Sequence, residues 1–310
     1  MIAPPIDRIN WEYKKLKEEL KGTLPDSSED LKAEEYLSKY NRALWDYLFT
    51  IYSFETSCAV CIIKLNDEFN LESKLEETNI KDLFDNAKQF DGRSAKSGKH
   101  YLAKIDQNEE ENFLKFWYVN FSIGKIPFGF DQMKEIIKTD RSNVFFLRKN
   151  NLLVFRGQAN KIAKLINQFN DDFNIKNSDI KFSSYKDNAL EISKKLKEKK
   201  YISLTTCEIS SENPYPGIQA SMVTFSLPIK ELGEEVDMDN LEETNEAKMF
   251  SKAKELSKKL TYTFENKCGY KEKALINAVN KKGTINISRK VSDLAIINFA
   301  MAVKNFYDEM

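Results

Sequence analysis

The sequence predicts an α+β fold, with a helical N-terminal part over residues 1–100 followed by a mixed α/β part over residues 101–310. Apolar residues recur at helical spacing in the first part. After residue 110, strand-like apolar runs alternate with amphipathic helices and include a β-β-α-β unit. Hydrophobic residues make up 41% of the chain and aromatic residues 12%, which is enough for a buried core despite 31% charged residues.

The N-terminal part is expected to contain three helices. The first covers residues 10–21 and ends at Gly22 and Pro25. A long second helix begins after Ser27 or Ser28, runs to residue 54, and has an apolar face of residues spaced three and four apart. That face either packs within its own domain or binds a protein partner or a second copy of the chain. A third helix covers residues 80–90, and Cys58 and Cys61 are read as buried thiols near the end of the long helix.

The β-β-α-β unit is the clearest passage of the mixed part. Strands at residues 144–147 and 152–155 flank the turn-forming pair Asn150–Asn151. A helix over residues 160–169 follows, with one apolar face, and a strand comes after it. Before this unit, the sequence predicts a strand or hairpin arm at residues 113–126 and a short helix at residues 131–138.

After this unit, helices and strands continue to alternate, which leaves a partly parallel sheet open. Helices are predicted at residues 186–199, 247–260 and 293–307, and strands at residues 201–209, 219–229, 261–264 and 284–288. The acidic segment 231–246 is interpreted as a solvated linker, the alternative being a segment that mimics a polyanion.

The net charge is zero, but its distribution is uneven. Residues 1–140 carry −6, residues 141–230 carry +7, residues 231–246 carry −8 and residues 247–310 carry +7. An acidic half is thus followed by a basic half with one acidic interruption, which permits an anionic partner. The N-terminus lacks an apolar leader, and the densest apolar stretch, residues 43–63, is broken by Asp46 and Glu55. We therefore expect a cytoplasmic protein without a membrane partner.

No catalytic or cofactor motif is complete. The loop from Gly92 to His100 resembles a phosphate-binding loop, but the glycine spacing is too long and His100 replaces the metal-binding hydroxyl. His100, the only histidine, is expected in a surface loop with no nucleophile motif beside it. We expect no cofactor and no metal. A metal-dependent nuclease whose site is dispersed in sequence, using residues such as Asp179, Glu198 and Lys200, remains the enzymatic alternative.

Nucleic-acid binding is the function that the residues favour. Basic side chains gather around the β-β-α-β unit, and Gly157 leads into a helix whose N-terminus can meet a phosphate. The candidate nucleic-acid-binding residues are Arg148, Lys149, Arg156, Lys161, Lys164, Lys194 and Lys195. They would form one exposed face that binds DNA or RNA. The competing interpretation is that these lysines are ordinary solvated surface.

We therefore expect a non-catalytic subunit of an intracellular complex. The richness in Lys, Asn, Ile and Glu is typical of AT-rich prokaryotic genomes, where a role in defence would suit such a subunit. A subunit that binds only protein, through the N-terminal helices, is the remaining alternative.

Overall fold

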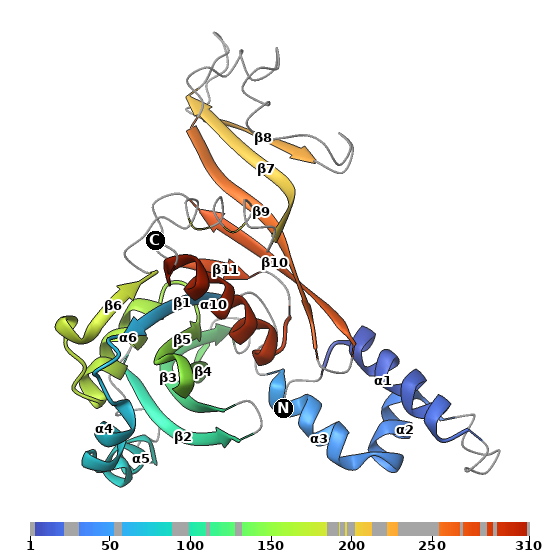
Figure 1. Cartoon of the computed structure of the whole chain (residues 1–310), viewed down its shortest axis with the longest axis horizontal. Helices are drawn as coiled ribbons and strands as arrows, with labels where there is room; N and C mark the ends of the chain where they lie inside the picture. The colour runs from blue at the N-terminus through green and yellow to red at the C-terminus, as the bar shows by residue number, and fades with distance from the viewer. Residues whose placement is uncertain are drawn as a thin grey trace.

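The computed structural model describes residues 4–21, 31–52, 58–88, 99–109, 112–127, 132–184, 192, 196, 202–212, 222–228, 254–266, 269–279, 284–287 and 290–308. These residues form one large sheet with helices on both faces and a group of helices at the N-terminus (Figure 1). The predicted α+β fold, with its helical N-terminal part, is confirmed.

The sheet has eleven strands in the order β2-β3-β4-β5-β1-β11-β10-β9-β7-β8, with β6 paired to β1. Every pairing among the described strands is antiparallel, so the partly parallel arrangement is not found there. The strands are β1 (Cys58–Leu65), β2 (His100–Asn108), β3 (Phe113–Pro127), β4 (Met133–Leu147), β5 (Leu152–Gly157), β6 (Ile180–Ser183), β7 (Ile202–Glu212), β8 (Met222–Pro228), β9 (Lys254–Glu265), β10 (Lys271–Val279) and β11 (Ile285–Ile287).

The residues around Cys58 form the central strand, β1, so the prediction that they belong to a helix is wrong. All eight of its residues are buried, and it pairs with β5, β6 and β11. A short continuous apolar run fits a buried strand as well as a buried helix, and β-branched Val60, Ile62 and Ile63 favour the strand. Because alternate residues face opposite sides of a strand, Cys58 and Cys61 lie in different core clusters. Both cysteines are buried, as predicted.

The helix predicted at residues 131–138 is wrong. Residues 133–138 begin β4, which pairs without interruption with β3 along fifteen residues. Their apolar spacing also fits a helix, but pairing with residues 121–127 satisfies the backbone groups of both segments in a hairpin. The strand predicted at residues 113–126 and the strands on either side of Asn150–Asn151 are confirmed.

Three helices cover one face of the first five strands of the sheet: α4 (Leu71–Glu77), α5 (Ile80–Lys88) and α6 (Ile162–Asp172). In α6, Leu165 and Phe169 are fully buried, and the Phe169 ring lies 5.2 Å from that of Phe116 on β3. Phe155 on β5 makes a similar edge-to-face contact at 5.5 Å. We call this the α6 face; the predicted helix of the β-β-α-β unit is confirmed.

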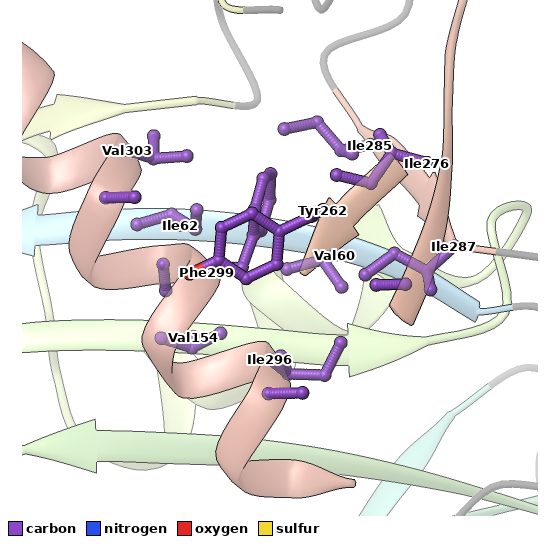
Figure 2. Close-up of a cluster of buried hydrophobic side chains, with 14 of the residues drawn as sticks. Val60, Ile62, Val154, Tyr262, Ile276, Ile285, Ile287, Ile296, Phe299 and Val303 are labelled. Carbon is purple, nitrogen blue, oxygen red and sulfur yellow. The ribbon is translucent and has the colours of Figure 1, made fainter. Parts of the chain in front are cut away.

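The opposite face, here the α10 face, is covered by the C-terminal helix α10 (Asp293–Asp308). Figure 2 shows Ile296, Phe299 and Val303 of this helix pointing at Val60 and Ile62 of the central strand. The fully buried Phe299 contacts Tyr262 of β9 with ring centroids 5.3 Å apart. The predicted terminal helix is therefore confirmed, and it joins the two halves of the sheet.

The long second helix is divided in two, α2 (Ala33–Tyr40) and α3 (Arg42–Ile51), and follows α1 (Ile6–Glu19). The break occurs at Asn41, whose side chain accepts a hydrogen bond from the backbone N–H of Leu44 at 3.0 Å and so caps α3. Leu37 and Leu48 are fully buried in two separate clusters within the chain. The apolar face thus packs internally, and self-association through it stays a prediction.

The C-terminal strands extend away from α4 and α5, and β9 and β10 reach toward α1 (Figure 1). The Trp11 ring of α1 lies 5.4 Å from that of Tyr270, which stands between these two strands. Residues 254–260 belong to β9, which contradicts the predicted helix 247–260 in that portion, because they pair with both β10 and β7. Segment 231–246, and the predicted helix 186–199 apart from residues 192 and 196, lie outside the described residues.

Candidate nucleic-acid interface

The predicted nucleic-acid-binding residues do not share one face. Arg148 and Lys149 form the turn before β5, whereas Lys161 and Lys164 follow the other end of that strand. Six strand residues separate the two groups by roughly 20 Å. Arg148 pairs with Glu72 of α4 at 2.6 Å, while Lys149 is exposed. Lys194 and Lys195 lie outside the described residues.

Arg156 is buried, so the prediction that it lies on an exposed face is wrong. It is 0% exposed on the α10 face of β5. Its Nη1 donates to Asp293 Oδ1 at 2.6 Å, its Nη2 donates to the carbonyl oxygen of Val291 at 3.0 Å, and its Nε contacts Cys58 Sγ at 3.4 Å. Arg156 therefore connects the sheet to the start of α10.

A second buried cation, Lys115 of β3, shares the same carboxylate. Its Nζ donates to Asp293 Oδ2, and it also lies 3.7 Å from the centroid of the Trp117 ring. Burial lowers the pKa of the Lys115 ammonium, and the charge of Asp293 opposes that change. Two buried cations on one carboxylate make Asp293 the residue on which this network depends.

The sequence around Asp293 starts α10 at this position. Ser292 Oγ accepts a hydrogen bond from the N–H of Ala295, and its own N–H and hydroxyl donate to Glu272 of β10, both at 2.6 Å. Asp293 then stands in the first turn, where the helix dipole favours a negative charge. The Ser-Asp pair was visible in the sequence, but its partners on β3 and β5 were not.

Lys161, at the start of α6, connects the helix to the sheet through hydrogen bonds. Its Nζ donates to Asn120 Oδ1 of β3 at 3.1 Å and to Asp140 Oδ2 of β4. Gln158 donates to the other oxygen of Asp140 at 2.9 Å. Lys161 is therefore half-buried and paired, whereas Lys164, one turn into the helix, is exposed.

His100 lies in the same region rather than in the predicted surface loop. It begins β2 directly opposite Asn120, and it is 1% exposed. Neither of its ring nitrogens has a hydrogen-bond partner within the described part of the chain. Burial is the main cause that lowers the pKa of the imidazole to about 4; the ammonium groups of Lys161 and Lys164 contribute to this lowering, and Asp140 opposes it.

Gly157 is needed at the end of β5 because there is no room for a side chain. A Cβ there would stand 2.8 Å from Ser142 Oγ, and Ser142 is itself buried. The sequence-based reason for this glycine was a tight turn. The structure shows close contact with β4 instead.

Gly157→Ala is expected to lower the free energy of unfolding by about 1–3 kcal/mol through overpacking. Urea denaturation measures this. Gly124→Ala is the matched control, since its Cβ would meet only the movable end of the Lys138 side chain at 2.9 Å, and we expect a change within about 0.5 kcal/mol. A double variant with Ser142→Ala should recover part of the loss. Equal effects at both glycines would contradict this explanation.

A hairpin arm extends beyond the neighbouring strands of the sheet, where the sequence predicted a strand or hairpin arm at residues 113–126 but a helix at residues 131–138. Residues 121–127 of β3 pair with residues 133–139 of β4. Both segments lie beyond their other neighbours, because the pairing of β2 with β3 stops at Asn120 and the pairing of β5 with β4 stops at Asn143. Neither segment has a further strand neighbour among the described residues. We call these fourteen residues the arm. At about 3.3 Å per residue it projects by roughly 23 Å.

One side of the arm is cationic. Alternate residues of a strand share a face, so Lys138 and Lys134 lie on the same side as Asp140, which holds Lys161. Both are exposed, and the Lys138 side chain lies across Gly124 of the neighbouring strand. With the paired Lys161 and the exposed Lys164 they form a row from α6 onto the arm. We call these four lysines the cationic track.

The end of the arm is apolar. Met133 is 62% exposed, Ile123 is 54% exposed and Ile126 is 38% exposed. Among the described residues, only two other large hydrophobic side chains are exposed, namely Ile6 and Tyr47. The helix predicted at residues 131–138 hid this arrangement. The alternation of Phe121 and Ile123 with Ser122 and Gly124 was the sequence signal that could have revealed it.

Among the described residues, no three His, Cys, Asp or Glu side chains gather closely enough to hold a metal ion. Asp179, from the nuclease hypothesis, accepts a hydrogen bond from the backbone N–H of Lys176 at 2.7 Å in a turn, while Glu198 and Lys200 lie outside the described residues.

Within the described ranges, none of the helices has the length and apolar character needed to cross a membrane.

No protein-family model matches this sequence, and comparison with curated proteins gives no significant match.

Proposed function

We propose that this protein binds nucleic acid without cleaving it, and that the cationic track and the arm are its contact surface. The observation that carries the proposal is the continuity of the track, from Lys164 in the first turn of α6 to Lys134 near the end of the arm. A row of ammonium groups releases counterions when it binds a phosphate backbone, and this supplies affinity without reading sequence.

The local charge balance supports a polyanion as the partner. Among the described residues, Asp140 is an acidic side chain that contacts the track, and it already accepts hydrogen bonds from Lys161 and Gln158. On the other side of the arm, Lys125 stands directly opposite Glu135 in the register, so that side is close to neutral. The positive charge of the arm is thus concentrated on the α6 side, where the track continues onto the body of the protein.

The test is the triple variant Lys134→Glu, Lys138→Glu and Lys164→Glu. Fluorescence anisotropy with labelled single- and double-stranded DNA and RNA, each at two salt concentrations, gives the affinities. We expect the wild type to bind with a salt-dependent affinity, and the variant to bind roughly 100-fold more weakly at low salt with a shallower salt dependence.

The matched control is Lys149→Glu, Lys176→Glu and Lys181→Glu, which makes the same charge change at three exposed lysines outside the track. It should retain affinity within about threefold, apart from a small long-range effect that salt screens. Equal losses in both triple variants would show that net charge, not the track, controls binding. Cleaved products on a gel in the presence of magnesium would overturn the non-catalytic assignment.

A further inference from the structure

We infer that the arm inserts its apolar end between base pairs of double-stranded DNA and bends the duplex. This inference rests on the proposed function and specifies the partner. Three of the five exposed large hydrophobic side chains in the described residues belong to the arm, namely Ile123, Ile126 and Met133. Contact with an apolar surface would remove this area from water, and the stacked bases offer such a surface inside a highly charged molecule.

The arm has the shape for insertion. It is only two strands wide, with a separation of about 4.8 Å between strands, and the major groove admits a two-stranded ribbon of this kind. Its last described pairs are Ile126 opposite Lys134 and Pro127 opposite Met133. Apolar side chains therefore point to both sides of the ribbon at these last described pairs. Proteins that use Ile, Met or Pro in this way unstack a base step and kink the duplex.

The charges favour this partner over a second copy of the chain. Lys134 and Lys138 follow the same ribbon from the apolar end back toward α6. They can contact phosphates beside the groove while the end of the arm meets the bases. Two arms packed together would bring these lysines toward one another, which is unfavourable. The Lys138 side chain lies along the ribbon surface over Gly124, so it does not obstruct entry.

The experiment measures bending separately from binding. A 25-base-pair DNA duplex carries a donor and an acceptor dye at its two ends, and energy transfer is followed as protein is added. We expect the wild type to increase energy transfer. We expect the double variant Ile126→Ser and Met133→Ser to bind within about fivefold of the wild type but to leave energy transfer unchanged. The matched control, Ile6→Ser and Tyr47→Ser, alters exposed apolar residues on the N-terminal helices and should bend DNA normally.

A mismatched duplex provides a second readout, because its bases are already partly unstacked and cost less to separate. We expect the wild type to bind a duplex with one central mismatch at least fivefold more tightly than the matched duplex, and the Ile126→Ser and Met133→Ser variant to show no preference. Binding without bending or mismatch preference would overturn the insertion but leave the proposed function intact. Equal bending of double-stranded RNA would overturn the assignment to DNA. If no nucleic acid binds, the proposed function itself fails.

Discussion

Asp293→Asn is expected to lower the free energy of unfolding by about 3–5 kcal/mol. Arg156 is 0% exposed and Lys115 is 4% exposed, and both donate to the carboxylate of Asp293. An amide has the same shape but no charge, so two buried cations would remain without a counter-charge. The loss should therefore exceed that of an ordinary hydrogen bond, which contributes about 1 kcal/mol.

Chemical denaturation by urea, followed by circular dichroism, measures this loss. Asp308→Asn is the control on the same helix, because Asp308 pairs with Lys304 at the exposed end of α10 and should change stability by less than about 1 kcal/mol. A loss below 1 kcal/mol for Asp293→Asn would mean that water reaches the cations and that the network is not closed.

Removing one of the two buried cations is a second test of the network around Asp293. Lys115→Met keeps most of the side-chain volume and leaves Asp293 paired with Arg156 alone. Starting from Asp293→Asn, adding Lys115→Met should recover stability, because one of the two uncompensated charges is then removed. Simple addition of the two single effects would show that the residues are not energetically coupled.

Local patterns in the sequence were enough to predict the central unit of the fold. The turn at Asn150–Asn151 and the apolar face containing Leu165 and Phe169 each depend on residues close together in the chain. Residues 58–65 and 133–138 were harder to assign, because their apolar spacing also fits a helix. Both became strands because neighbouring strands pair with them, and this information lies far away in the sequence.

The candidate site was harder to predict for the same reason. In the sequence, Arg156 is one of several basic residues near a turn. Only the fold shows that the carboxylate of Asp293, 137 positions later, pairs with its positive charge. The exposed lysines Lys134 and Lys138 were overlooked because the segment was read as a helix. The order of charged residues separates positive from negative segments along the chain, but register decides which lysines share a face.

The stability of the folded protein should also fall as the pH is lowered from about 6.5 to 4, in part because of His100. Its pKa in the folded state is about 4, against an ordinary value near 6.5. Above pH 6.5 the imidazole is neutral in both states and contributes nothing to the pH dependence. Between these values the unfolded chain takes up the proton and the folded protein does not, so unfolding becomes easier. The contribution reaches roughly 3 kcal/mol at pH 4 and then levels off.

His100→Gln isolates this contribution, because the amide does not titrate. The difference in unfolding free energy between wild type and variant should be constant above pH 7 and should change by roughly 3 kcal/mol between pH 6.5 and 4. Carboxyl groups such as Glu272, whose pKa burial raises, titrate in both proteins and cancel in the difference. Since His100 is the only histidine, its imidazole proton resonance gives the pKa directly in an NMR titration. A resonance that titrates near pH 6.5 would show that the ring is hydrated, and would remove the reason for this pH dependence.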